Sequence, residues 1–538
     1  MRRVDCDVSV EHYQLVFLFW GAQGFAARQV RAWSYDGTQI KFQIAAPDTT
    51  TPASLVTLTP RASITDDAAR LEHARLELCA RLAHLAINRL DETAWKIETC
   101  ALSPSTRRTH PGKFARVILA RGRSRIALTC DLTNIATPTD THRTTMRPAT
   151  DALLASSLLW LARLASRPTA SRKSGRSNRA QNTLDNNPAS TQLWIAASGA
   201  HASEISLRCA CLRPPTQACL RVWSANDALT ALTAEPIPLL DEAVYTSRHS
   251  ASRLTRTTHQ PPQLAQRIRL LAPEAIDIIP ARHGETLRFH GLAFARLRRL
   301  MNREHLWLGV SHNARTQSKR DYFRFAINEI DTTDTDISDT DTTAHTWQSI
   351  LPSINELIAK LIAARRHDSP THRHTLFHLA PESWLESLLR RDITRLDAGL
   401  RLAPLHAQLR TAHTASHAPR PVDLLAVRRD GRLVVIELKV AEDDALPFQA
   451  ADYWRRIETL RRADQLDSLF ENVRLADAPP LVYAVAPLLR FARTFDALAE
   501  HLSPRIELYR FDINEDWRAG VRVMRRARVG STSVNRES

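Results

Sequence analysis

The chain has 538 residues, which exceeds a single hydrophobic core and predicts two to four domains. No apolar run reaches the eighteen or so residues that a membrane-spanning helix needs, so we expect no membrane partner. The net charge of +16 suits a phosphate-rich partner. Residues 381–538 contribute only +2 of this charge, with 25 Lys and Arg against 23 Asp and Glu. The seven cysteines, an odd number, predict free thiols and a cytoplasmic location.

Residues 1–165 are predicted to form an α+β domain. Segments such as QIKFQIA and FARVILA read as short strands, and residues 14–26 read as a buried first strand. Apolar residues recur at helical spacing over 66–90, and a more apolar helix is predicted over 151–165. A basic stretch poor in apolar residues follows at 166–191, which predicts a disordered linker and a domain boundary.

A β-rich middle region is predicted over 192–330, with strands at LWIAAS, EISLRCACL, ETLRFHGLAFARL and LWLGV. A Thr/Asp-rich linker is predicted over 331–348, followed by a connecting helical segment over 349–380. We see no internal repeat. The chain has no phosphate-binding loop of the G-x-x-x-x-G-K-[ST] kind and no G-x-S-x-G motif, so nucleotide triphosphate hydrolysis and serine-hydrolase chemistry are not expected.

The last predicted domain spans 381–530 and alternates helices with strands. A helix after Pro381 carries Glu386 and Glu382, and a first strand is predicted to run to Gln408. Two apolar strands then flank an Asp-Gly turn, over 421–439. They are followed by an amphipathic helix, a strand at 481–489, a helix at 494–502 and a last strand at 505–513.

Three charged residues share the apolar hairpin: Asp423, Glu437 and Lys439. Two converging carboxylates repel each other unless a cation lies between them, and oxygen ligands of this kind suit Mg²⁺ or Mn²⁺. Glu437 and Lys439 lie on the same face of a strand because side chains alternate with a period of two. Lys439 could therefore orient or deprotonate an attacking water and stabilise charge on a phosphoryl oxygen.

The turn geometry decides whether the two carboxylates meet. A two-residue turn at Asp430-Gly431 would put Asp423 and Glu437 on opposite faces of the sheet. A three-residue loop over 429–431, with Gly431 in the left-handed conformation of a bulge, places Asp423 opposite Glu437. The metal-site hypothesis requires the second arrangement or an equivalent bend.

These residues resemble the PD-(D/E)xK nucleases, and within them the NucS-type and RecB-type nuclease domains. Val422 is inserted where the family has Pro-Asp, whereas Glu437-Leu438-Lys439 matches the (D/E)xK element. Gln449 and Tyr453, four residues apart, resemble the QxxxY motif of RecB-type domains, whose side chains position substrate or lysine. The resemblance implies a restriction-endonuclease-like α/β fold of order αβββαβ, a catalytic set of Asp423, Glu437, Lys439 and Glu386, and Mg²⁺ or Mn²⁺ held by the three carboxylates. Glu382 is the alternative to Glu386.

The hypothesis is therefore a metal-dependent endonuclease that hydrolyses DNA, with protein partners bound through the N-terminal domains. A second interpretation keeps the fold as a non-cutting binding or scaffolding module, which the inserted Val422 favours. A third assigns the main role to the N-terminal portion, as a subunit of a defence or repair complex. In the blandest interpretation Glu437 and Lys439 form a solvated stripe, but the run Val434, Val435 and Ile436 lacks the polar alternation of such a strand.

Overall fold

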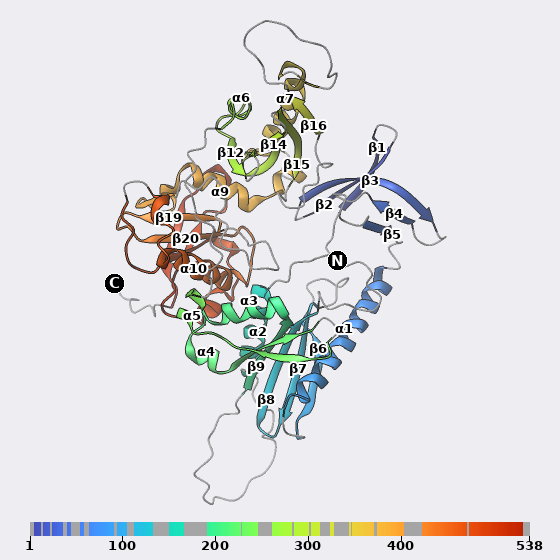
Figure 1. Cartoon of the computed structure of the whole chain (residues 1–538), viewed down its shortest axis with the longest axis vertical. Coiled ribbons are helices and arrows are strands. Elements are labelled where there is room, and N and C mark those ends of the chain that lie inside the picture. The colour runs from blue at the N-terminus through green and yellow to red at the C-terminus, as the bar shows by residue number, and fades with distance from the viewer. Residues whose placement is uncertain are drawn as a thin grey trace, which may run out of the picture.

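The computed structural model describes the chain as a mixed α/β protein with four sheets (Figure 1). The described residues are 5–11, 14–21, 24–35, 40–44, 54–58, 64–90, 94–104, 112–132, 150–165, 191–226, 229–245, 261–281, 284–300, 303–311, 323–327, 344–345, 347–370, 374–402, 422–470 and 473–530. None of the helices in these ranges combines the length and apolarity needed to span a bilayer.

The first sheet is an antiparallel meander of five strands. Its strands are β1 (Asp5–Glu11), β2 (Gln14–Gly21), β3 (Gly24–Tyr35), β4 (Ile40–Ile44) and β5 (Ser54–Leu58), paired in chain order. The single strand predicted over 14–26 is wrong, because the chain turns after Gly21 and pairs with itself from Gly24.

The second sheet has six strands and begins after α1 (Ile64–Ile87), which confirms the first predicted helix. An antiparallel trio, β6 (Lys96–Leu102), β7 (Phe114–Arg121) and β8 (Ser124–Asp131), leads into α2 (Thr150–Ala165). Next come β9 (Thr191–Ser198), α3 (Gly199–Cys209), α4 (Pro214–Ala218), β10 (Leu220–Ala225), β11 (Leu232–Glu235) and α5 (Leu240–Tyr245). We call residues 64–245 the first unit.

The boundary predicted at 166–191 does not separate two sheets. Strands β8 and β9 lie on either side of it and pair in parallel, Thr129 with Ile195, with α2 as the crossover helix. Parallel neighbours need a connection long enough to cross the sheet, and a helix is the usual form. Of the predicted linker, residues 166–190 lie outside the described residues.

Residues 204–209 of the segment EISLRCACL belong to α3, so its prediction as a strand is wrong. Its residues alternate like those of a half-buried strand, but the buried set Ala202, Ile205, Cys209 and Leu212 recurs at helical spacing. The segment therefore forms a helix, because burial of one helix face stabilises it more than the two-residue alternation would stabilise a strand.

The third sheet divides the predicted middle region. After α6 (Gln263–Leu270), a second antiparallel meander comprises β12 (Ile276–Ala281), β13 (Gly284–Phe289), β14 (Leu292–Leu300), β15 (Arg303–Ser311) and β16 (Phe323–Ile327). A short strand β17 (Ala344–His345) adds to its edge in parallel, and α7 (Trp347–Ala364) packs on the same core. Residues 192–330 therefore contribute to two different sheets.

The fourth sheet contains the predicted hairpin. After α8 (Thr375–His378), α9 (Pro381–Arg391) and a 3-10 turn, β18 (Leu400–Leu402), β19 (Leu424–Arg428) and β20 (Leu433–Leu438) pair antiparallel. They are followed by α10 (Leu446–Arg462), β21 (Leu481–Pro487), α11 (Phe495–Ala499), β22 (Glu507–Ile513) and β23 (Val523–Arg528). We call residues 381–530 the second unit. Strand β23 was not predicted, and the predicted stretch to Gln408 lies outside the described residues beyond Leu402.

Helices cover both faces of this sheet (Figure 1). Leu385 and Leu389 of α9 pack with Val434 and Ile436 of β20 on one face. Tyr453 and Ile457 of α10 pack on the other face, with the residues of β20 that alternate with these. The burial on both sides explains why the hairpin reads as continuous apolar runs.

The second and the fourth sheet have the same topology. In each sheet a helix precedes three strands that pair antiparallel. A fourth and a fifth strand then add in parallel, and a sixth strand pairs antiparallel at the edge. Each is also preceded by a meander of five antiparallel strands, to which the third sheet adds β17 as a short parallel edge strand. Our expectation of no internal repeat is therefore wrong for the fold, because topology depends on the pattern of apolar residues rather than on their identities.

Candidate functional site

The hairpin β19–β20 has the register that the metal-site hypothesis requires. Leu424 pairs with Ile436. The backbone N–H of Arg428 donates to the carbonyl of Arg432, and the carbonyl of Arg428 accepts from the N–H of Gly431, which leaves a three-residue loop over 429–431. Gly431 has φ +81°, in the left-handed region. The three-residue loop that the hypothesis requires is present, and Asp423 lies opposite Glu437, one step beyond the last paired residues.

Asp423 stands where the two strands separate. Its Oδ2 accepts a hydrogen bond of 2.9 Å from the backbone N–H of Leu438, so a side-chain carboxylate takes the place of the next backbone acceptor of β19. This bond holds the half-buried carboxylate against the end of β20. The inserted Val422 is buried and packs with the α10 face of the sheet, which anchors the strand just before Asp423.

Glu437 is almost fully buried, with 1% of its surface exposed, and its partners are polar. Lys439 Nζ donates to Glu437 Oε1 over 2.9 Å, and Gln449 Nε2 donates to the same oxygen. A buried carboxylate requires such partners, because leaving it without them would cost several kcal/mol. The structure thus brings the strand pair Glu437 and Lys439 together with the first turn of α10.

Tyr453 completes this group from one turn further along α10. Its hydroxyl accepts a 3.3 Å hydrogen bond from Gln449 Nε2, and its ring packs in the core below. The spacing of four residues predicted that Gln449 and Tyr453 share a face, and they do. Gln449 contacts Glu437 and Tyr453 contacts Gln449, so the pair orients the carboxylate.

The charge state of Lys439 follows from its surroundings. Burial alone would lower the pKa of its amine, but the carboxylates of Glu437, Glu382, Asp423 and Asp443 outweigh burial and raise the pKa above its ordinary value. Asp443 lies 4.0 Å from Nζ. The amine therefore keeps its proton in this arrangement and acts as a hydrogen-bond donor.

The pKa of Asp423 is raised well above its ordinary range. Burial is the largest cause, the charge of Glu437 adds to it, and the charge of Glu386 adds further. Lys439 and the bond from Leu438 oppose these effects without cancelling them. Two acidic groups that disfavour each other's ionisation form a place where an added cation is strongly stabilised.

Glu386 acts on Asp423 through its charge and is bound by arginines. It is buried on α9, where Arg390 Nε donates to Oε1 over 2.7 Å and Arg288 Nη1 lies 3.7 Å from Oε2. Arg288 belongs to β13, so a residue of the second meander reaches the site. Glu382, the alternative, is exposed in the first turn of α9 and acts on Lys439 through its charge.

Neither arginine was named from the sequence. Arg390 follows Glu386 by four residues, the spacing of a helical ion pair, so its contact could have been predicted. Arg288 is distant along the chain, and no local pattern points to it.

The donor set fits a hard divalent ion. Asp423 and Glu437 provide carboxylate oxygens only, as Mg²⁺ prefers, and Mg²⁺ commonly binds through one or two carboxylates with water and phosphate completing its shell. Within the ranges that the structure describes, no three or more His, Cys, Asp and Glu side chains gather closely enough to form a ready-made metal site. The role of Glu386 as a third ligand stays a prediction.

Comparison of the chain with protein-family models, curated proteins and solved structures finds no match.

Proposed function

We propose that the chain is a metal-dependent nuclease of the PD-(D/E)xK type, which hydrolyses phosphodiester bonds of DNA in the second unit. The observation that carries the proposal is the placement of Asp423, Glu437 and Lys439 at the end of one hairpin, with the lysine amine 2.9 Å from the glutamate. The order of elements from α9 to β21, a helix, three strands, a helix and a strand, supports the same fold type.

Asp423 and Glu437 would hold Mg²⁺ or Mn²⁺. When bound, the ion supplies Lewis-acid polarisation of a phosphoryl oxygen and lowers the pKa of a water. Gln449 and Tyr453 fix the orientation of Glu437, so that its oxygens are set before substrate arrives. Preorganised groups of this kind lower the barrier because they need not reorganise during the reaction.

Lys439 would act as a donor rather than as a base. Its amine carries a proton among four carboxylates, so it can orient the attacking water or stabilise negative charge that develops on the phosphoryl group. Deprotonation of the water must then rest on another group. Of the two roles toward the attacking water that the sequence left open for Lys439, orientation and deprotonation, the proposal keeps orientation.

The overall basic charge supports a nucleic-acid partner; DNA is the proposed one, and RNA is the alternative that the test must separate. Purified protein incubated with duplex DNA, single-stranded DNA and RNA should cleave DNA with Mg²⁺ or Mn²⁺ and lose cleavage with a chelator. Lys439→Ala should lower the cleavage rate by about 100-fold or more, which is the usual loss for a preorganised donor.

The matched control is Lys360→Ala, which removes an exposed lysine paired with Glu356 on α7. It should cleave at the wild-type rate. Undiminished cleavage by the Lys439→Ala protein, or cleavage that ignores the chelator, would overturn the proposal.

A further inference from the structure

The first unit contains positions equivalent to those of the candidate site. In the second unit Glu437 lies five residues after Arg432, the residue that closes the hairpin opposite Arg428. In the first unit Thr129 lies five residues after Ser124, which closes the hairpin opposite Arg121. The pairing with the next strand supports the same equivalence. Thr129 pairs with Ile195, Glu437 pairs with Ala484, and Ile195 and Ala484 belong to the same hydrophobic core.

The first unit has different chemistry at these positions. Arg116 pairs with Thr129 and so takes the place of Asp423, while Asp131 takes the place of Lys439. Thr129 Oγ1 shares a 2.7 Å hydrogen bond with Ser157 Oγ of α2, where the second unit has a buried carboxylate. The result is a hydroxyl pair beside a guanidinium, and neither attracts a divalent cation.

Arg116 is fixed by its neighbours. Its Nη2 donates to Ser156 Oγ over 3.2 Å, and its guanidinium lies 5.5 Å from the ring centre of Trp160. A positive charge thus stands where the second unit has its first acidic residue. Every charged position of the trio is altered in the first unit.

The two units exchange hydrogen bonds reciprocally. Leu212, after α3, forms an antiparallel bridge with Leu502, after α11, so that equivalent segments meet each other. Arg213 N donates to the carbonyl of His501 over 2.9 Å, and Ser503 N donates to the carbonyl of Cys211 over 2.8 Å. Such reciprocity is the signature of a two-fold axis, as in the interface of a symmetric dimer.

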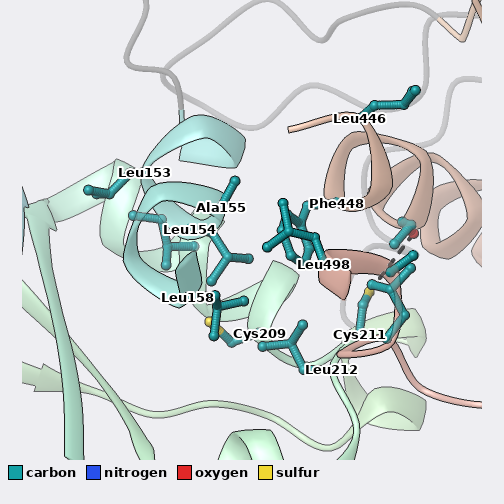
Figure 2. Packing of buried hydrophobic residues seen from close by; sticks show 14 of the residues in the cluster. Leu153, Leu154, Ala155, Leu158, Cys209, Cys211, Leu212, Leu446, Phe448 and Leu498 are labelled. Carbon is teal, nitrogen blue, oxygen red and sulfur yellow. Dashed lines mark hydrogen bonds between the residues drawn. The ribbon is translucent and has the colours of Figure 1, made fainter. Parts of the chain in front are cut away.

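Equivalent elements also share one hydrophobic core. Leu154 and Leu158 of α2 and Cys209 of α3 face Phe448 of α10 and Leu498 of α11 across it (Figure 2). The face of the second unit that carries α10 and α11 is therefore covered by the first unit. No second copy of the chain can occupy that face in the same way.

A buried group of ions crosses the same boundary. Arg208 of α3 binds Asp151 of α2 and lies 3.5 Å from Asp452 of α10, which also binds Arg455 and Arg456. Because these charges are largely buried, a shift of one unit against the other would leave a charge without its partner, so the ion group fixes the relative placement of the units.

We propose that this chain is a dimer folded into one polypeptide, with one competent site, and that it cuts a single strand of duplex DNA at each encounter. This inference rests on the proposed function. The two strands of a duplex run antiparallel and are related by two-fold axes, so a symmetric pair of sites would serve both strands. Here the first unit lacks the acidic pair of the candidate site, so the second strand stays intact.

The test is a time course on supercoiled plasmid in molar excess over the full chain, with Mg²⁺. The expected early product is the open circle, and linear plasmid should form only late, from independent nicks. The rate per chain should not change with protein concentration, because no second copy is needed. Linear plasmid that forms together with the open circle, or a rate per chain that rises with concentration, would overturn the inference and leave the proposed nuclease intact. Absence of cleavage of any DNA or RNA would overturn both.

Two variants separate the units. Glu437→Gln should abolish nicking, whereas Thr129→Val, which keeps the shape of a buried side chain, should nick at the wild-type rate. A loss of about 10-fold or more in the Thr129→Val protein, with its unfolding midpoint unchanged, would show that the first unit takes part in cleavage and would overturn the inference.

Discussion

At the scale of single residues, the candidate site depends on how Glu437 is held. A carboxylate with 1% exposure accepts from an ammonium and from an amide, and that amide in turn is fixed by a tyrosine hydroxyl. Groups that orient a metal-binding residue typically affect activity by 10- to 100-fold without touching the substrate.

Gln449→Leu tests this positioning role. The variant keeps the apolar stem but loses the bond to Glu437, so cleavage should fall by about 10- to 100-fold. Because Gln449 does not contact substrate in this account, KM should change little and kcat should carry the loss. Steady-state kinetics decide it, with Gln266→Leu on the exposed face of α6 as the control. A rise in KM with kcat unchanged would instead indicate a direct contact with DNA.

Gly431→Ala tests the turn that sets the register. A Cβ at this position would lie 2.3 Å from the carbonyl oxygen of Arg474, in a left-handed conformation that L-residues disfavour. Gly122, in the turn of the equivalent hairpin, is also left-handed but has nothing within 4 Å of such a Cβ. Gly122→Ala should lose about 1 kcal/mol in urea unfolding and Gly431→Ala clearly more. Equal losses would contradict the close approach.

The sequence left two registers of this hairpin open, and it showed that only the three-residue loop brings Asp423 opposite Glu437. It also placed Gln449 and Tyr453 on one helix face. The contact of Arg288 with Glu386 could not be predicted, since it depends on how the second meander packs on α9. Residue types indicated the chemistry of the trio, but only the packing shows that Lys439 is surrounded by acids.

At the scale of elements, α10 connects the site to the rest of the molecule. One face carries Gln449 and Tyr453 to the hairpin, and another carries Phe448 and Asp452 to the first unit. A helix buried on several faces loses the polar stripe that marks a surface helix. The sequence therefore predicted the helix but not its second contact.

Asp452→Asn tests the ion group between the units. Burial would raise the pKa of Asp452, but Arg208, Arg456 and Arg455 outweigh burial and lower the pKa far below its ordinary value. The charged form thus stabilises the fold at pH values above the ordinary Asp pKa of about 4, and this stability is lost as pH falls toward the lowered pKa.

At pH 7 the Asp452→Asn variant should be about 3–5 kcal/mol less stable, because it leaves buried arginines without their counter-ion. The difference from wild type should shrink below about pH 4, where the unfolded chain gains a proton that the native carboxylate resists. Urea unfolding between pH 3 and pH 8 measures it, with the fully exposed Asp477→Asn as the control. A difference that does not depend on pH would contradict the electrostatic explanation.

The elements themselves were predicted unevenly. Long amphipathic helices such as α1 and α2 were found because many turns repeat one pattern. The short helix α3 was missed because nine residues can satisfy a two-residue and a helical period together. Strand β23 was missed because its arginines interrupt the apolar pattern from which strands are predicted. Charged residues are common on edge strands, where they protect a sheet from further pairing.

At the scale of the whole molecule, the repeated topology and the reciprocal contact at Leu212 and Leu502 dominate the architecture. No residue pattern in the sequence predicted this repeat, because equivalent positions of the two units differ in charge and size. The shared core means that the two units should not be stable independently of each other. The domain boundary inferred from composition therefore fell inside a sheet.

Phe448→Ala tests the shared core. The side chain is 1% exposed and lies among residues of both units, so its truncation should cost about 3–5 kcal/mol. Hydrogen exchange should then accelerate in β9 as well as in β21, because one core supports both sheets. Leu489→Ala, with 70% exposure, is the control. Faster exchange confined to the second unit would show that the units are independent.

The central claim is that Asp423 and Glu437 together hold a divalent ion, and Mn²⁺ titration followed by electron paramagnetic resonance tests it most directly. The wild-type chain should bind about one Mn²⁺ that Mg²⁺ displaces, as expected for an oxygen-ligand site. The double variant Asp423→Asn and Glu437→Gln should lose this binding, while Thr129→Val retains it. Mn²⁺ that stays bound in the double variant, or a wild-type chain that binds none at millimolar concentration, would contradict the account.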